Sequence, residues 1–174
     1  MLPCMASARA PEPSFPETIA LSSGERALSK LGEYRYVYRV FFKLYDAALY
    51  VSPLAKPDDV LKAKTSYRLQ FRYLREIEKS IILESSAKML EKNLNSQELA
   101  QIAERVGRLN AAYQTVKEGD QSSLTYLPET GTTLRINGAP VITIEGQDFA
   151  RLYFTIWLGE QPISVPLREH LLGR

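Results

Sequence analysis

The stretch FKLYDAALYV, residues 42–51, is mostly apolar or aromatic, yet it carries a lysine, an aspartate and two tyrosines. It completes a longer segment, 34–51, whose aromatic and β-branched residues favour one long strand or two consecutive strands. Pro53 and Pro57 follow, and a proline ends a strand because it lacks the amide donor. The stretch therefore indicates a strand at the centre of a sheet, with most of its side chains in the core.

Outward from this strand, the other expected strands form separate groups along the chain. Residues 67–73 alternate between large apolar side chains on one face and arginine or glutamine on the other, which is typical of a half-buried strand. Turn residues at 22–24, 128–131 and 137–138 separate the remaining strands. These are expected at 14–21, 27–31, 123–127, 132–137 and 141–145. Grouped rather than alternating elements favour an α+β fold over a doubly wound one.

Helices are expected between and after these groups. Leucines and alanine at 83–94 form one apolar stripe, and a second stripe runs from Leu99 to Tyr113, with Ser96 as its N-cap. Further helices are expected at 57–63, 147–158 and 166–172. The prediction is a single antiparallel sheet of six or seven strands, with one face under helices.

The composition suits one globular domain and excludes several classes of function. The chain has 174 residues and a formal net charge of +2, too little to predict nucleic-acid binding. One cysteine and one histidine, Cys4 and His170, rule out a disulfide framework and disfavour a zinc site or a catalytic triad. No apolar run approaches the length of a membrane-spanning helix. No metal, no cofactor and no catalytic residue are expected.

Residues 1–14 differ in composition from the domain expected at 15–174. The sequences ASA and ARA are small-residue patterns of the kind that signal peptidase cuts after, and a proline-rich stretch follows them. The basic and apolar parts of a complete signal peptide are missing. Two interpretations stand: a remnant of a signal peptide, which implies a periplasmic or secreted protein, or a disordered tail on a cytoplasmic one.

Four residues are candidates for holding a ligand. Strict alternation along 34–45 places Arg35, Arg39 and Tyr45 on one face. Arg75 follows the apolar face of 67–73 at the point where that strand ends, where a guanidinium could bind a carboxylate with two hydrogen bonds at the mouth of an apolar cleft. The alternative is that these cations extend into solvent, as exposed arginines commonly do.

An ordered set of short motifs resembles the bacterial chalcone isomerase-like family. The set begins with FKLYDAALY at 42–50 and continues with YLREI at 73–77, KEGD at 117–120 and Asn137-Gly138. It closes with Gly146-x-Asp148-Phe149-Ala150, IWLG at 156–159 and LLG at 171–173. The resemblance implies an open-faced β-sandwich, in which a large antiparallel sheet carries helices on one face and a ligand cleft lies between.

The family includes plant chalcone isomerases and non-catalytic members, some of which bind fatty acids through an arginine and a tyrosine. Where the enzymes have a threonine in the strand motif, this chain has Tyr45. Their helical tyrosine and asparagine are missing from 78–92, and their last threonine falls near Ile156. Their arginine corresponds to Arg35 or Arg39. The resemblance therefore implies a chain without chalcone isomerase activity.

Three functional hypotheses follow from these residues. The first is an exported, non-enzymatic protein that binds a small amphipathic ligand such as a fatty acid, with Arg75 as anchor and Arg39, Arg35 and Tyr45 assisting. The second is an isomerase or lyase that uses the same cleft, with Tyr45 as a weak acid. The third is a protein-interaction module without a ligand cavity.

Overall fold

The computed structural model describes residues 12–21 and 27–174 of the chain. The signal-peptide-like patterns, which fall in residues 1–11, lie outside these residues, as does the expected turn at 22–24. The division into a tail and a domain, and the export that it implies, therefore stay predictions.

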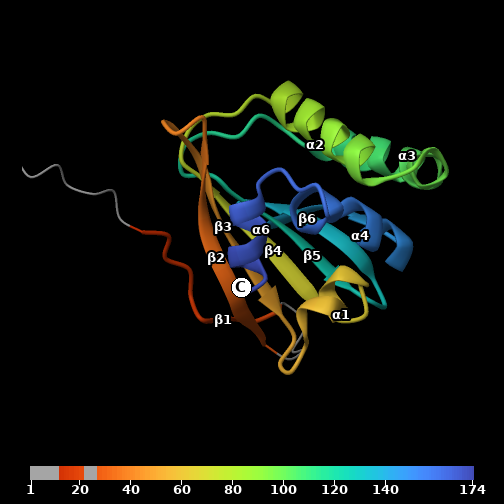
Figure 1. Cartoon of the computed structure of the whole chain (residues 1–174), viewed down its shortest axis with the longest axis horizontal. Helices are drawn as coiled ribbons and strands as arrows, with labels where there is room; N and C mark the ends of the chain where they lie inside the picture. Colours follow the sequence, from red (N-terminus) through yellow and green to blue (C-terminus); the bar gives the residue numbers. More distant parts are fainter. Residues whose placement is uncertain (1–11, 22–26) are drawn as a thin grey trace, which may run out of the picture.

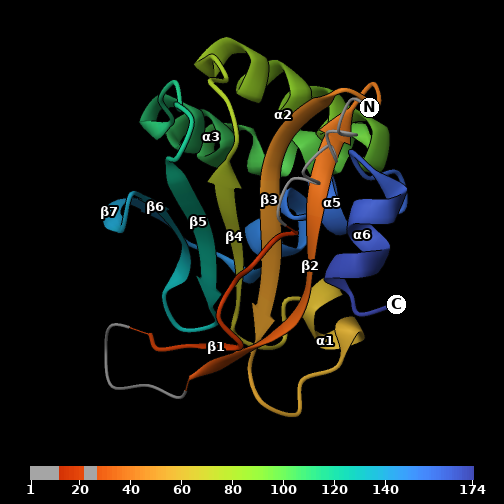
Figure 2. The same ribbon diagram turned by 90° about the vertical axis from the view of Figure 1, so that its left-hand side faces the viewer.

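Within residues 12–21 and 27–174, seven strands form one antiparallel sheet in which every strand pairs with its neighbours in chain order. The predicted fold class, an α+β protein with a sheet of six or seven antiparallel strands, is confirmed. Figures 1 and 2 show a curled sheet with helices on one face. The strands are β1 (Thr18–Ile19), β2 (Leu28–Tyr38), β3 (Phe42–Val51), β4 (Tyr67–Tyr73), β5 (Gln121–Leu127), β6 (Gly131–Ile136) and β7 (Ala139–Ile144).

The opening stretch, residues 42–51, is β3, and it lies between β2 and β4. Tyr45, Ala47 and Leu49 face the helices and belong to the main core, while Ala48 and Tyr50 belong to a smaller apolar cluster on the other side. The segment before β1 covers that outer side, because the Tyr50 hydroxyl donates to the Pro16 carbonyl at 2.8 Å. Figure 2 shows this segment crossing the face of the sheet. The strand is therefore buried on both faces along most of its length.

The expectation that one face of 34–45 carries Arg35, Arg39 and Tyr45 together is wrong. The chain reverses after Tyr38, so the segment is a hairpin of β2 and β3, and the pairing shifts between Tyr36 and Val37. Arg35 pairs with Asp46 on the outer face, whereas Tyr36 pairs with Tyr45 on the inner face. A reversal and an irregularity each break the two-residue period on which the expectation depended.

In the part of the chain that the structure describes, six helices accompany the sheet: α1 (Pro57–Leu61), α2 (Lys79–Asn93), α3 (Ser96–Ala112), α4 (Gln147–Tyr153), α5 (Thr155–Leu158) and α6 (Val165–Leu171). The N-cap of α3 is Asn95, one residue before the prediction. Its side chain accepts from the Glu98 amide at 2.9 Å, and the Glu98 carboxylate accepts from the Asn95 amide. The single helix predicted at 147–158 divides at Phe154 into α4 and α5.

The core lies between the sheet and the helices. Large aromatic residues fill much of it: the Tyr67 ring meets the Phe154 ring edge-on at 4.8 Å, and the Phe71 and Trp157 rings are 5.4 Å apart. Aromatic side chains bury large apolar areas, so these contacts hold α5 against β4. Phe154, at the junction of α4 and α5, is itself buried in this core.

Candidate functional site

Arg35 is part of an ion pair on the outer face of the sheet. Its guanidinium donates to both carboxylate oxygens of Asp46, at 2.6 and 2.9 Å, and Arg72 donates to the same carboxylate at 3.0 Å. Asp46 is fully buried. Burial raises the pKa of a carboxyl, but the hydrogen bonds from Arg35 and Arg72 outweigh it, so the pKa of Asp46 lies below its usual value. Arg35 therefore joins β2 to β3.

Tyr45 lies on the inner face, away from Arg35. Its ring is 5.2 Å from the Tyr36 and Phe71 rings, and its hydroxyl has no hydrogen-bond partner among the described residues. Burial raises the pKa of Tyr45 far above its usual value, and the nearby Trp157 indole offsets only part of this. A hydroxyl with so high a pKa stays protonated near neutral pH, so it can donate a hydrogen bond but is a poor acid.

Arg39 and Arg75 lie at the end of the β2–β3 hairpin, where both are exposed. Arg39 stands over the Tyr38 ring at 5.2 Å, and Arg75 stands over the Phe42 ring at 5.1 Å. The four residues predicted to hold a ligand thus lie in three places: the outer face, the inner face and the hairpin end. The structure brings only Arg39 and Arg75 to the same end of the sheet.

A polar cavity of about 490 Å³ opens on the outer face of the sheet. Burial lowers the pKa of Arg68 there, and the charge of nearby Arg135 lowers it further. Side-chain hydroxyls and amides make up most of the remaining lining, which comprises Ala20, Gln70, Gln121, Ser122, Ser123, Asn137 and Gly138. Such a lining suits a polar anion and offers little surface to an apolar chain.

A second cavity, of about 480 Å³, lies on the helical side, and we call it the helix-face groove. Five apolar residues line it: Val60, Leu61, Phe154, Leu158 and Leu172. Four of these are buried in the core, and Leu61 is half-buried. Polar and charged residues complete the lining: Lys92, Asn93, Arg151, Thr155, Gly159, Glu160, Gln161, Arg168 and Arg174. The groove thus joins apolar surface to cations.

Positive charge predominates at the helix-face groove. Lys92, Arg151, Arg168 and Arg174 are its basic residues, and Glu160 is its one acidic residue. Arg168 is held by the Glu169 carboxylate at 2.8 Å and by the Gly159 carbonyl at 2.9 Å. Within the described residues, no carboxylate lies within ion-pair distance of the side chains of Lys92 or Arg174. These two cations are therefore available to an anionic group in the groove.

The sequence predictions missed this groove because four separate segments build it. Val60 comes from α1, Lys92 from the end of α2, Phe154 from the α4–α5 junction and Leu172 from the end of α6. No local motif links these positions. The one available signal was the pair of basic residues, Lys92 and Arg151, on helices whose opposite sides carry the apolar stripes.

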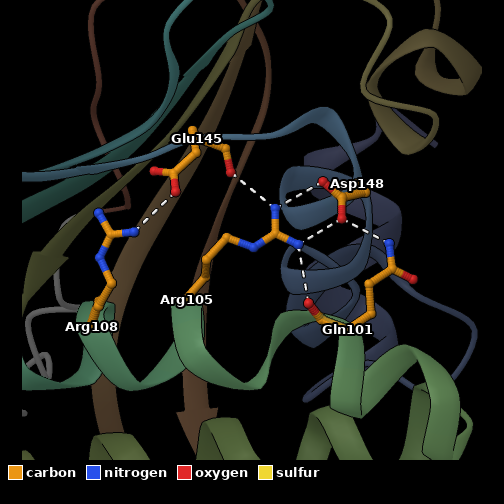
Figure 3. Close-up of polar contacts among 5 residues, drawn as sticks. All are labelled: Gln101, Arg105, Arg108, Glu145 and Asp148. Carbon is orange, nitrogen blue, oxygen red and sulfur yellow. Dashed lines mark hydrogen bonds and ion pairs between the residues drawn. The ribbon is translucent and has the colours of Figure 1, made fainter.

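A cluster of polar residues around Asp148 is structural. Arg105 donates to both oxygens of the Asp148 carboxylate, at 2.9 and 2.6 Å, and Gln101 donates to one of them (Figure 3). The Arg105 hydrogen bonds hold the pKa of Asp148 well below its usual range. Arg105 also donates to the Glu145 carbonyl at 3.1 Å. The cluster fixes α3 to the start of α4 and leaves the Asp148 carboxylate occupied.

Within residues 12–21 and 27–174, no group of three or more histidine, cysteine or acidic residues is placed to hold a metal ion. No helix in this part of the chain combines the length and apolar character needed to cross a membrane.

Comparisons with known proteins agree with the fold. A family model described as chalcone isomerase-like matches residues 11–173. The crystal structure of a fatty-acid binding protein of Arabidopsis thaliana is similar, with a TM-score of 0.68 and 16% sequence identity, and the match covers 91% of each chain. At this identity the likeness shows a shared fold. A search of curated proteins gave no match.

Proposed function

The chain belongs to the chalcone isomerase-like family, and on that premise we propose that it is a non-enzymatic binding protein for an amphipathic carboxylate such as a fatty acid. The observation that carries the proposal is the helix-face groove, in which apolar residues adjoin Lys92 and Arg174, two cations without an ion-pair partner among the described residues. Its volume falls within the range of small-ligand sites. A structural relative is described as a fatty-acid binding protein, which supports the same ligand class.

The chemistry of the groove suits both ends of such a ligand. Phe154, Leu158 and Leu172 line the groove but are only 2–4% exposed, so an acyl chain contacts their edges together with the half-buried Leu61. This contact supplies the apolar part of the binding free energy. Lys92 and Arg174 offer charge to the carboxylate at the exposed rim. An exposed charge pair contributes modestly, so acyl length is expected to set the affinity and the cations to set the orientation.

The raised pKa of Tyr45 supports a non-enzymatic role. Proton transfer works best when the pKa of the donor lies near the working pH, and burial moves the pKa of Tyr45 in the opposite direction. Tyr45, which stands where the enzymes have a threonine, is thus poorly suited to proton transfer near neutral pH. Loss of a turnover reaction on Tyr45→Phe would contradict this part of the proposal.

A displacement titration tests the groove directly. The purified chain is titrated with a fluorescent acyl carboxylate, which is then displaced by saturated fatty acids of increasing length. We expect saturable binding that strengthens with chain length, and a weakening of roughly three- to ten-fold in Lys92→Glu, because a favourable charge becomes a repulsive one. Lys88→Glu, one turn earlier on the exposed side of α2, is the matched control and keeps the parent affinity.

The same titration separates the groove from the site predicted by sequence. Arg75→Ala removes the predicted anchor and leaves the groove intact. If Arg75→Ala abolishes binding while Lys92→Glu has no effect, the ligand lies at the hairpin end and the placement in the groove is wrong. If no acyl carboxylate binds saturably, the proposed function itself is wrong.

A further inference from the structure

The tip of the β2–β3 hairpin, residues 38–43, exposes an unusual amount of apolar surface. The exposed fractions are 46% for Tyr38, 83% for Val40, 84% for Phe41 and 46% for Phe42. Single exposed apolar residues are common, but here four of five consecutive positions at one hairpin tip are apolar and exposed. Figures 1 and 2 place this tip at the end of the sheet near α2, away from α1.

Cations surround this apolar patch. Arg39 and Lys43 lie within the tip, and Arg75 stands over the Phe42 ring at 5.1 Å. Within residues 12–21 and 27–174, none of the three is within ion-pair distance of a carboxylate. Both cation–aromatic contacts at the tip keep the guanidinium groups beside the rings, at the border between apolar surface and solvent.

The backbone of the tip is poorly suited to its own residues. Arg39 and Val40 have φ angles of 47° and 64°, in the left-handed region that a β-branched residue such as valine strongly disfavours. The β6–β7 hairpin uses Asn137 and Gly138 at φ angles of 48° and 83°, the usual choice for such a turn. Folding alone would favour asparagine or glycine at position 40 as well. A strained residue that folding disfavours points to a role for its side chain.

We propose that this tip docks on an anionic lipid membrane, with Val40 and Phe41 inserted among the lipids and Arg39, Lys43 and Arg75 at the headgroups. Apolar and aromatic side chains flanked by cations suit the boundary between headgroups and acyl chains. A protein interface buries a much larger and flatter area than four side chains at a hairpin end supply. Each cation near an anionic surface contributes roughly a five-fold gain in binding. This docking does not depend on the helix-face groove.

Vesicle co-sedimentation of the full chain tests the proposal. The probes are vesicles of phosphatidylcholine alone and of phosphatidylcholine mixed with phosphatidylglycerol. We expect binding to the mixed vesicles only, and a loss of that binding as salt is raised. Phe41→Ser is expected to weaken binding roughly ten-fold or more, because it removes the largest exposed apolar side chain from the lipid.

Two further variants distinguish specific vesicle binding from a loss of folding and from nonspecific hydrophobic adsorption. Val40→Asn suits the turn better, so we expect an equal or higher denaturation midpoint together with weaker vesicle binding. Leu54→Ser is the matched control, because Leu54 is 99% exposed but follows β3 at the opposite end of the strand, and it should leave binding unchanged.

Several outcomes would overturn the proposal. These are equal binding to both kinds of vesicle, no binding to either, or a loss in Leu54→Ser as large as that in Phe41→Ser. Self-association of the parent chain that Phe41→Ser abolishes, without vesicle binding, would assign the patch to a second copy instead. Lys92→Glu, which tests the helix-face groove, should leave vesicle binding intact, so the two proposals fail separately.

Discussion

At the scale of single residues, Tyr45 and Tyr73 form a natural comparison. They are partners across β3 and β4, both face the helices, and both are buried. The Tyr73 hydroxyl hydrogen-bonds to the Ser122 hydroxyl at 2.9 Å, whereas the Tyr45 hydroxyl has no partner among the described residues. Burial raises the pKa of Tyr73 to about 12, so both hydroxyls are neutral.

The two tyrosine-to-phenylalanine variants are expected to differ in stability. Tyr73→Phe loses a hydrogen bond and leaves the buried Ser122 hydroxyl unpaired, so the free energy of unfolding should fall by about 1 kcal/mol. Tyr45→Phe removes a hydroxyl that lacks a hydrogen-bond partner among the described residues, so stability should be unchanged or rise by up to about 1 kcal/mol. Urea denaturation at neutral pH measures both. A loss in Tyr45→Phe equal to that in Tyr73→Phe would mean that an internal water or ligand satisfies the Tyr45 hydroxyl.

From the sequence, the burial of a residue such as Tyr45 could be predicted, but the side chain that it or Arg35 contacts could not. The composition of 42–51 predicted that Tyr45 lies in a buried central strand, and this is confirmed. The partner of Arg35 could not be predicted, because Arg35 and Asp46 meet only once the hairpin has set its register. Pairing across strands is a long-range property, and a one-residue shift moves a side chain to the other face.

At the scale of elements, Gly32 decides how closely α6 approaches β2. A Cβ atom at Gly32 would lie 1.8 Å from the His170 carbonyl oxygen and 2.9 Å from its carbon, which is backbone that cannot rotate away. Gly107, on the exposed side of α3, has nothing within 4 Å of the corresponding position. Substitution of Gly32 therefore tests close packing between α6 and β2, whereas substitution of Gly107 tests helix propensity alone.

Gly32→Ala and Gly107→Ala are expected to change stability in opposite directions. Gly32→Ala must push α6 away from the sheet, so the free energy of unfolding should fall by about 2 kcal/mol or more. Gly107→Ala reduces the freedom of the unfolded chain within a helix, so stability should rise by about 0.5–1 kcal/mol. Thermal and urea denaturation report both changes. If Gly32→Ala is as stable as the parent chain, α6 does not pack on β2 as described.

Regular elements with a clear local pattern were the predictable part of the fold. The strand at 67–73 and the Asn137-Gly138 turn follow from alternation and turn chemistry, and both are confirmed. The reversal at residues 39–41 has no such signal, since valine disfavours the backbone that it adopts. The helix-face groove was equally hidden, because it arises where the ends of four segments meet. The reversal and the groove both depend on tertiary packing, which a local sequence pattern does not encode.

At the scale of the whole molecule, two aspartates join parts of the chain that are distant in sequence. Asp46 connects β2, β3 and β4 through Arg35 and Arg72, and Asp148 connects α3 to α4 through Arg105. The pKa of each carboxyl lies below its usual value in the folded chain. The two clusters share no residue, so their contributions to stability should be close to additive.

The sign of the resulting pH dependence follows from these lowered pKa values. Below about pH 4, the usual pKa of aspartate, the unfolded chain binds protons that the folded chain does not. The stabilisation from both clusters is therefore fully present above about pH 4, and it is lost as the pH falls through the pKa values of the folded chain. The parent chain should lose stability steeply in this acidic window.

Substitution of either aspartate should reduce the loss of stability in acid, and the two substitutions should differ in their cost at pH 7. Asp46→Asn leaves two guanidinium groups around a buried amide, so stability at pH 7 should fall by about 3 kcal/mol, with a weaker dependence on acid. Asp148 is about one-third exposed, so solvent screening limits the cost of Asp148→Asn to about 1 kcal/mol. Asp58→Asn is the control, since the Asp58–Lys62 pair lies in solvent and should contribute little.

Urea denaturation midpoints between pH 7 and pH 2.5 measure the stability of all three variants. If the Asp46→Asn chain loses stability in acid as steeply as the parent chain, the Asp46 carboxylate does not contribute to the pH dependence of stability.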